Sequence, residues 1–277
     1  EYMKRTLFRA PILGRIISYL LRLKIAAGLF FSYSWVIGKW FVSSREYTNF
    51  TYALTPENVE DLADFVSVVT GEKSSIAKGF IDEIQQDSQL RKHIENGSKN
   101  LPFSDGADKT IHFARRIGWY ALVRVTKPVV VVETGIDKGL GSCVIAAALK
   151  KNHADGISGK LLAVDINPNA GGLINGEYGE FVEKIFSDSL AAIDGMTQDI
   201  DLFIHDSDHS FSHEASEYER LVDRLSAKSL VISDNAHVSR ELRQFANRVR
   251  RKYLFWSERP AGHFYPGGGI GAAYLDQ

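Results

Sequence analysis

Oxygen-bearing side chains follow two apolar runs that have the composition of buried strands. Asp206 ends the run that begins at Ile200, while Asp234 and Asn235 end the run that begins at Ser229. Because neighbouring parallel strands place their carboxyl ends side by side, these three side chains can converge on one point. Three oxygen donors at one place suit a hard divalent cation such as Mg²⁺. The pattern therefore predicts a metal site with open positions for water or for substrate oxygens.

Such a set could activate a hydroxyl group. A neutral hydroxyl is a poor nucleophile, and a metal bound to it lowers its pKa so that a base can take the proton. The competing interpretation is that strand-end aspartates cap the following helices. His205, His209 and His213 recur every four residues, which would bind zinc if all three lay on one helix. Because His205 belongs to the strand, we do not expect a zinc site.

A glycine-rich turn follows the four valines Val129–Val132 and forms a second candidate site. Gly135 and Gly139 would let the backbone approach a ligand at the start of the next helix, where unpaired N–H groups favour anions. Glu133 ends this strand and Asp165 ends the following one, so both carboxylates could accept hydrogen bonds from ribose hydroxyls. A nucleotide-like cofactor is the ligand that this turn predicts.

The elements that must position these residues alternate between strand and helix. The strands expected before the tail are 129–132, 160–165, 183–186, 200–206 and 229–234. Alternating strands and helices predict parallel β/α units in an open, doubly wound sheet. Tyr253–Trp256 and Ile270–Leu275 have no helix between them, so they should pair antiparallel and complete a mostly parallel, seven-stranded α/β fold.

Helices are expected ahead of the sheet. Thr55 and Pro56 mark a helix start, and Gly71 marks its end. Further helices are expected over 75–86, 88–94 and 109–125, with a linker over 96–106. The single cysteine, Cys143, should be a small buried hydrophobe.

The first 45 residues are basic and apolar, with Glu1 as their only acidic residue until Arg45. The uncharged run Ile25–Gly38 is shorter than the roughly 20 residues that a spanning helix needs, and Arg15, Arg22 and Lys24 interrupt the apolar stretch before it, so a transmembrane helix is not expected. The same interrupting charges argue against a secretory signal. A helical appendage that packs on the main domain or on a second subunit is the simpler interpretation. Basic residues flanking Trp35 and Trp40 also suit peripheral contact with anionic lipid.

The sheet, the turn at 133–135, the strand-end Asp165 and the Ser187-Asp188-Ser189 turn together resemble the class I S-adenosylmethionine-dependent methyltransferases. The resemblance runs from about Thr110 to the C-terminus. It implies a cofactor site that comprises Glu133, Thr134, Gly135, Gly139, Ser142, Asp165, Asp188 and Asp206, with Asp165 at the ribose and Asp188 near the adenine. The chain departs from the usual loop by having Gly141-Ser142 where a single Ser or Thr commonly stands.

Asp206 followed by the Asp234-Asn235 pair further resembles the metal site of the catechol-type and sugar-type (macrocin-type) O-methyltransferases. That resemblance implies Asp206, Asp234 and Asn235 as ligands of a divalent metal, Mg²⁺ above all, and His209 as the catalytic base. The implied enzyme methylates a hydroxyl of a small molecule or glycan with S-adenosylmethionine as donor. The corresponding domains are a helical extension (1–50), a helical cap or substrate-side subdomain (51–105) and the methyltransferase domain (106–277).

The net charge of the chain argues against a nucleic-acid partner. The 33 basic and 34 acidic residues nearly cancel, so a nucleic-acid partner is not expected. The single cysteine favours a reducing compartment, which predicts a cytoplasmic protein with peripheral membrane contact or oligomer contact through residues 1–45. Two alternatives stay open, namely a nucleotide-dependent oxidoreductase on a Rossmann-like fold and a non-catalytic, membrane-associated scaffold.

Overall fold

The structure is a computed structural model that describes residues 11–44, 52–101 and 110–276. These residues form two compact units. One contains the long helix α2 (Pro11–Ser43) together with Gly262–Phe264, and the other contains the rest of the described chain. Both predicted domain boundaries, at 50/51 and at 105/106, lie outside the described residues, so the domain division stays a prediction.

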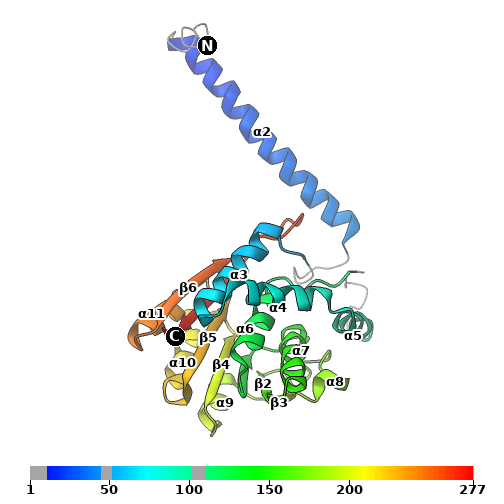
Figure 1. Cartoon of the computed structure of the whole chain (residues 1–277). Coiled ribbons are helices and arrows are strands. Elements are labelled where there is room, and N and C mark those ends of the chain that lie inside the picture. Colours follow the sequence, from blue (N-terminus) through cyan, green and yellow to red (C-terminus); the bar gives the residue numbers. More distant parts are fainter. Residues whose placement is uncertain (1–10, 45–51, 102–109, 277) are drawn as a thin grey trace. The chain divides into compact units, whose positions relative to one another are not determined.

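A seven-stranded sheet organises the larger unit (Figure 1). The strands are β1 (Val130–Thr134), β2 (Lys160–Asp165), β3 (Val182–Phe186), β4 (Ile200–His205), β5 (Leu225–Asp234), β6 (Lys252–Ser257) and β7 (Gly269–Tyr274). Their order is β3-β2-β1-β4-β5-β7-β6, with β7 antiparallel to both of its neighbours and the first five strands parallel. The predicted doubly wound fold and the antiparallel tail are confirmed. The order reverses between β1 and β4, which is where such sheets bind ligands.

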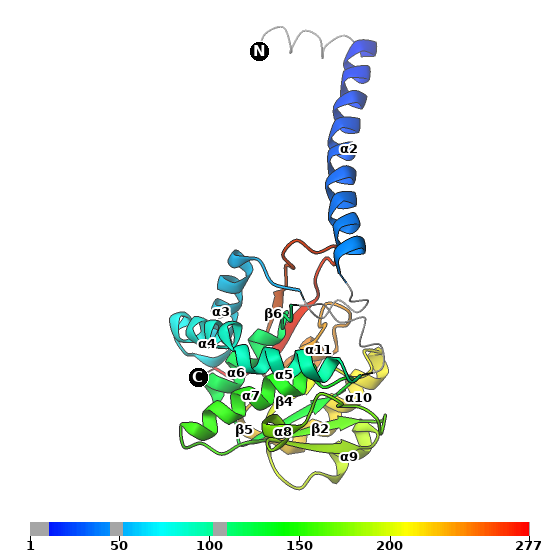
Figure 2. The ribbon, with the colours of Figure 1, turned by 90° about the vertical axis from the view of Figure 1, so that its right-hand side faces the viewer.

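Helices cover both faces of the sheet (Figure 2). The first core cluster joins one face to α3 (Pro56–Thr70), α4 (Ser74–Gln86), α5 (Ser88–Ser98), α6 (Arg116–Thr126) and α7 (Leu140–Ala154). The second joins the other face to α9 (Ser189–Gly195), α10 (Phe211–Leu221) and α11 (Glu241–Arg248). The short α8 (Gly176–Gly179) and a 3₁₀ turn (Val222–Arg224) complete the list. Burial on both faces explains the continuous apolar strands.

Capping residues at the two ends of α3 agree with the helix start and end predicted from the sequence. The Thr55 hydroxyl accepts the Asn58 N–H at 3.3 Å, and Gly71 takes a left-handed φ of 72° after α3, as predicted. Cys143 is fully buried, also as predicted. The expected linker from residue 96 was wrong for its first part, because α5 continues to Ser98 and buries that residue.

The helix expected over 109–125 was wrong at its start. Lys109 lies outside the described residues, and α6 begins only at Arg116. Ala114 adopts a φ of 50°, which ends any helical path that reaches it from the N-terminal side. After this turn the Arg115 side chain is buried, and it contacts Asp234 at the carboxyl end of β5.

Candidate active site

The carboxyl ends of β1, β4 and β5 meet, because Thr134 pairs with His205 and His205 pairs with Ser233. The three predicted metal ligands follow these positions and lie together. The Asp206 carboxyl is in hydrogen-bond contact with that of Asp234, and the Asn235 amide donates to Asp234 at 3.1 Å. The geometric expectation of convergence is therefore confirmed, while the role of the three residues stays a prediction.

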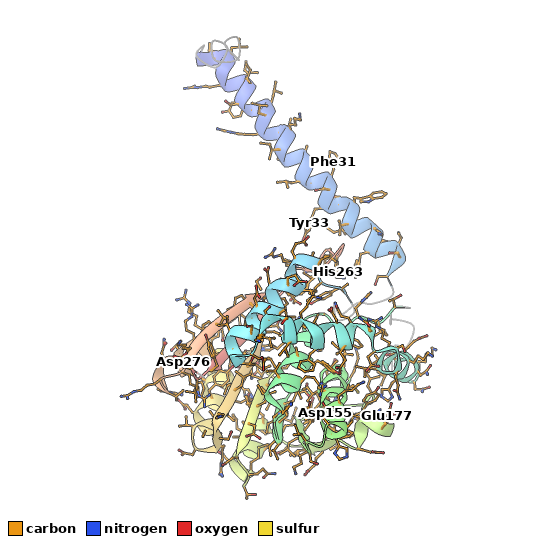
Figure 3. All side chains as sticks on the ribbon, viewed as in Figure 1. Phe31, Tyr33, Asp155, Glu177, His263 and Asp276 are labelled. Atoms are coloured by element: carbon orange, nitrogen blue, oxygen red, sulfur yellow. The ribbon has the colours of Figure 1, made fainter. Side chains whose placement is uncertain are left out.

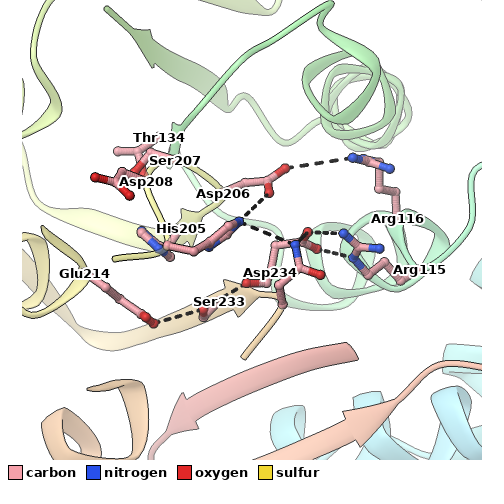
Figure 4. A network of polar contacts seen from close by, with 12 residues as sticks. Arg115, Arg116, Thr134, His205, Asp206, Ser207, Asp208, Glu214, Ser233 and Asp234 are labelled. Atoms are coloured by element: carbon pink, nitrogen blue, oxygen red, sulfur yellow. Dashed lines mark hydrogen bonds and ion pairs between the residues drawn. The ribbon is translucent and has the colours of Figure 1, made fainter. Parts of the chain in front are cut away.

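A guanidinium group that the sequence analysis did not single out already holds Asp234 (Figure 4). Both carboxylate oxygens of Asp234 accept N–H donors from Arg115, and Arg115 also binds Glu258 at 2.9 Å and the Tyr52 hydroxyl at 3.2 Å. Arg115, Asp234 and Glu258 are all buried. Burial opposes the charge of Asp234, but Arg115 outweighs it and lowers the pKa of that carboxyl.

The pKa of Asp206, the neighbouring carboxyl, shifts in the opposite direction. Burial and the neighbouring charge of Asp234 raise the pKa of Asp206 well above its usual range, although Arg116 works against this shift. The nearest Arg116 nitrogen is 3.9 Å from an Asp206 oxygen. The surroundings therefore favour the protonated form of Asp206 and the ionised form of Asp234.

This donor set does not fit a divalent cation as it stands. A metal between the two carboxylates would compete with the Arg115 fork for both oxygens of Asp234, and it would face two guanidinium groups at close range. Among residues 11–44, 52–101 and 110–276, no group of three or more His, Cys, Asp or Glu side chains is arranged to hold a metal. Arg115 supplies the fixed positive charge that the family pattern assigns to a metal.

The predicted base, His209, stands beside this cluster. Its Nε2 is 3.4 Å from the Asn235 amide nitrogen and 3.7 Å from an Asp206 oxygen. Burial, followed by the nearby His205, lowers the pKa of His209 below 6.5. Its imidazole is therefore neutral at pH 7 and able to accept a proton. His205 ends β4 and binds Glu217 at 2.7 Å, which agrees with the expectation that the three histidines share no helical face.

The glycine turn adopts conformations that only glycine reaches without strain. Gly135 has a φ of 92°, and a Cβ there would overlap the backbone carbonyl of Asp206. Gly139 has a φ of 93° and begins α7, where a Cβ would meet Ile174 and Gly171. The turn thus brings the backbone just after β1 close to the backbone just after β4. The expected approach of this turn to a bound ligand stays a prediction.

Two cavities open at this edge of the sheet and share Arg116, Gly135, Asp137 and Asp206 in their walls. Cavity A, of about 730 Å³, is lined by Asp165, Asp188 and His213 in addition. Cavity B, of about 270 Å³, is lined by Glu133, Asn235 and Tyr265 in addition. Together they form a continuous binding region around the strand ends.

Asp165 and Asp188 each have a defined place in cavity A. Asp165 accepts the N–H groups of Ile136 and Asp137 through Oδ2, at 2.8 and 3.1 Å, and that of Asn167 through Oδ1. Its Oδ1 therefore keeps acceptor capacity for a ligand. Asp188 caps α9 by accepting two backbone N–H groups, so the capping interpretation holds for this residue as well.

Glu133 lines cavity B and not cavity A, which differs from the expectation that it would share the ribose with Asp165. Its carboxyl turns toward α7 and accepts the Ser142 hydroxyl. Burial raises the pKa of Glu133 to about 8. The side chains of Ser142 and Thr134 are buried and line neither cavity, because they bind Glu133 and Glu217.

Four residues of this region were missed from the sequence, namely Arg115, Arg116, Glu258 and Tyr52. Arg116 lines both cavities, and its Nε is buried without a hydrogen-bond partner in the described part of the chain. The only local signal was a pair of adjacent arginines directly ahead of an apolar helix. Glu258 and Tyr52 carried no signal, because their contacts with Arg115 cross more than 60 positions of sequence.

Residues 132–236 match a protein-family model described as a methyltransferase domain. None of the curated proteins with which the chain was compared matches it. Solved structures similar to it include the SAH-bound methyltransferase PaMTH1 of Podospora anserina, with 12% identity, 81% of this chain and 98% of that chain covered, and a TM-score of 0.49. Another is the O-methyltransferase TomG of Streptomyces achromogenes in complex with SAM. The two chains are 15% identical, the match covers 69% of this chain and 91% of that chain, and the TM-score is 0.46.

A third is an O-methyltransferase from Bacillus cereus in complex with SAH. The two chains are 14% identical, the match covers 79% of this chain and 99% of that chain, and the TM-score is 0.44. The family match spans β1, the glycine turn, Asp165 and the strand ends that carry Asp206 and Asp234. The sheet order, the turn geometry and this match agree with one another. Residues 132–236 are therefore similar to a methyltransferase domain.

Proposed function

We propose that the protein transfers the methyl group of S-adenosylmethionine to a hydroxyl oxygen of a small molecule or glycan, of the sugar or natural-product type. The observation that carries the oxygen acceptor is the position of the His209 imidazole, whose Nε2 lies 3.7 Å from an oxygen of Asp206 on the wall that the two cavities share. A hydroxyl needs a base as it attacks, and a neutral histidine is well suited to take its proton near pH 7.

The charges in cavity B support an amino-acid moiety in the cofactor. Glu133 offers a carboxyl whose ionised form a cationic ammonium group would favour, and Arg116 offers a buried guanidinium to a carboxylate. The methionyl part of S-adenosylmethionine carries both groups. In cavity A, Asp165 would accept ribose hydroxyls, and Asp188 would lie toward the adenine.

When bound, S-adenosylmethionine supplies an electrophilic methyl group on its sulfonium. The residues of this chain then hold the acceptor in line and remove its proton, so that no covalent enzyme intermediate is needed. Asn235 and Asp206 lie within contact of His209 and would orient its ring. Tyr265 lines cavity B and offers an aromatic face to a sugar or phenol ring.

Calorimetry tests the cofactor directly. We expect S-adenosylmethionine to bind the full chain, and Asp165→Asn to weaken binding by about 10- to 150-fold, since one charge-assisted hydrogen bond contributes about 1.5–3 kcal/mol. A suitable control is Asp199→Asn, which changes an aspartate outside both cavities. Binding of a nicotinamide dinucleotide without binding of S-adenosylmethionine would instead support the oxidoreductase alternative.

The resemblance predicts metal assistance, whereas the contacts of Arg115 with Asp234 favour methyl transfer without a metal. We follow the contacts and expect methyl transfer to a hydroxyl acceptor to be unchanged after dialysis against EDTA and unchanged on addition of excess Mg²⁺. Methyl transfer measured with radiolabelled donor provides the readout. Activity lost in EDTA and restored by Mg²⁺ would assign Asp206, Asp234 and Asn235 to a metal after all.

A further inference from the structure

Helix α2 exposes large apolar side chains along its whole length. Phe30, Phe31, Trp35 and Phe41 are 67%, 69%, 77% and 77% exposed. Figure 3 shows the side chains standing out from α2 over many turns. By length and composition, the part from Ile12 to Ser43 could cross a membrane, and the apolar window that meets this criterion is not buried inside the protein. Water is an unfavourable environment for a surface of this size.

The exposed surface runs around the helix and not along one stripe. Consecutive residues of an α-helix point about 100° apart, so Leu29, Phe30 and Phe31 face three different directions, and each is more than 60% exposed. A second helix would cover a single stripe and leave the other directions in water. A lipid bilayer covers every direction at once.

The rest of unit 1 covers only a small part of this surface. The Trp40 and Phe264 rings lie 4.4 Å apart, and the Tyr33 hydroxyl donates to the Phe264 carbonyl at 2.6 Å. Both contacts involve the C-terminal third of α2. The turns that carry Leu29, Phe30 and Phe31 therefore stay uncovered within the unit.

Charge is distributed as a bilayer requires. Arg15, Ser18 and Arg22 are spaced three and four residues apart and so share one face of the first half of α2. Between Lys24 and Lys39 the helix carries no charged residue. Lysine and arginine side chains at the ends of an apolar stretch reach toward lipid headgroups, and Trp and Tyr favour the same interface.

We propose that α2 inserts into a lipid bilayer, with residues 25–38 in the hydrocarbon region and its basic residues at anionic headgroups. The expectation against a spanning helix rested on the length of this uncharged run and on Arg15, Arg22 and Lys24, which interrupt the apolar stretch before it. The helix itself has 33 residues and is about 50 Å long at 1.5 Å per residue, which exceeds the roughly 30 Å hydrocarbon core. The inference does not depend on the proposed methyl transfer, since it uses α2 alone.

Vesicle flotation of the full chain tests the proposal. With vesicles of phosphatidylcholine and phosphatidylglycerol at a 4:1 ratio, we expect the protein to float and to remain bound in high salt and in alkaline carbonate. The combined variant Leu29→Ser, Phe30→Ser and Phe31→Ser should partition at least about a thousandfold less, since three large apolar side chains leave the lipid. The matched control is Val68→Ser, Ile76→Ser and Val222→Ser, which removes exposed apolar side chains outside α2 and should float like the unmodified chain.

Two outcomes would overturn the proposal. One is that the unmodified chain stays at the bottom of the gradient with these vesicles. A dimer that depends on α2, detected by sedimentation of the same non-floating chain, would explain that result and would equally contradict the proposal. The other is flotation of the α2 variant to the same extent as the control. Circular dichroism of both variants checks that the helices and the sheet are retained.

Discussion

Replacing Arg115 with methionine is expected to lower the free energy of unfolding by about 3–5 kcal/mol, the usual cost of leaving buried partners of an ion pair without their counter-charge. The Arg115 side chain joins Asp234 on β5 to Glu258 just after β6, and both carboxylates are at most 1% exposed. Without the guanidinium, two acidic groups would lie in the interior next to Asp206. Urea unfolding followed by circular dichroism measures the effect.

The neighbouring arginine provides a matched control. Arg116→Met removes a guanidinium that lies on the cavity walls, 3.9 Å from Asp206, and that makes no two-pronged contact with a carboxylate in the described residues. We expect it to change the unfolding free energy by less than about 1 kcal/mol, since loosely paired charges contribute little, while weakening cofactor binding. An Arg115→Met variant as stable as Arg116→Met would contradict the structural role of Arg115.

A double-mutant cycle separates the pair from its surroundings. Asp234→Asn removes the charge that Arg115 neutralises but keeps the size of the side chain. If the two residues stabilise the fold through each other, the double variant should be less destabilised than the sum of the two single variants, by about 1–3 kcal/mol. Additive effects would mean that Arg115 acts mainly through Glu258 and Tyr52.

The strands and the glycine turn could be predicted because their causes are local or periodic. Three of the four consecutive valines, Val130–Val132, are buried in β1, whereas Val129 precedes the strand and is exposed. Gly135 and Gly139 both adopt a positive φ. The convergence of Asp206 and Asp234 followed from sheet topology alone, because the parallel strands β4 and β5 are neighbours.

The partners of these carboxylates could not be predicted, because they come from distant parts of the chain. Arg115 reaches Asp234 across 119 positions of sequence, and it does so only because Ala114 takes a left-handed conformation that shortens the expected helix. The helical spacing of Ile111, Ala114 and Ile117 gave no sign of that turn. The same limit explains Glu133, whose direction is set by Ser142 on α7 and not by its place at the end of β1.

The two arginines beside Asp206 and Asp234 change the chemistry that we expect of the site. Three oxygen donors alone favour a metal, but the same donors beside two guanidinium groups already have their charge balanced. We therefore propose that proton removal from the acceptor depends on a protein base. His209 is the residue in the described site whose burial and position suit that task.

His209→Gln is expected to lower kcat by about 10²–10⁴-fold, the range typical of losing a positioned general base. The affinity for S-adenosylmethionine should stay within about twofold, because His209 lines neither cavity A nor cavity B. The matched control is His153→Gln on α7, whose ring packs on Phe181 away from the strand ends and which should leave kcat unchanged.

The pH dependence of kcat distinguishes a base from a residue that only shapes the site. Burial and His205 lower the pKa of His209 below 6.5, so the imidazole is neutral and active at pH 7 and becomes protonated only on acidification. The kcat of the unmodified chain should therefore be flat from pH 7 to 8 and fall below pH 6.5. In His209→Gln the residual rate should lose that acidic limb. A variant that keeps both its kcat and its acidic limb would exclude His209 as the base and would direct attention to the protonated Asp206.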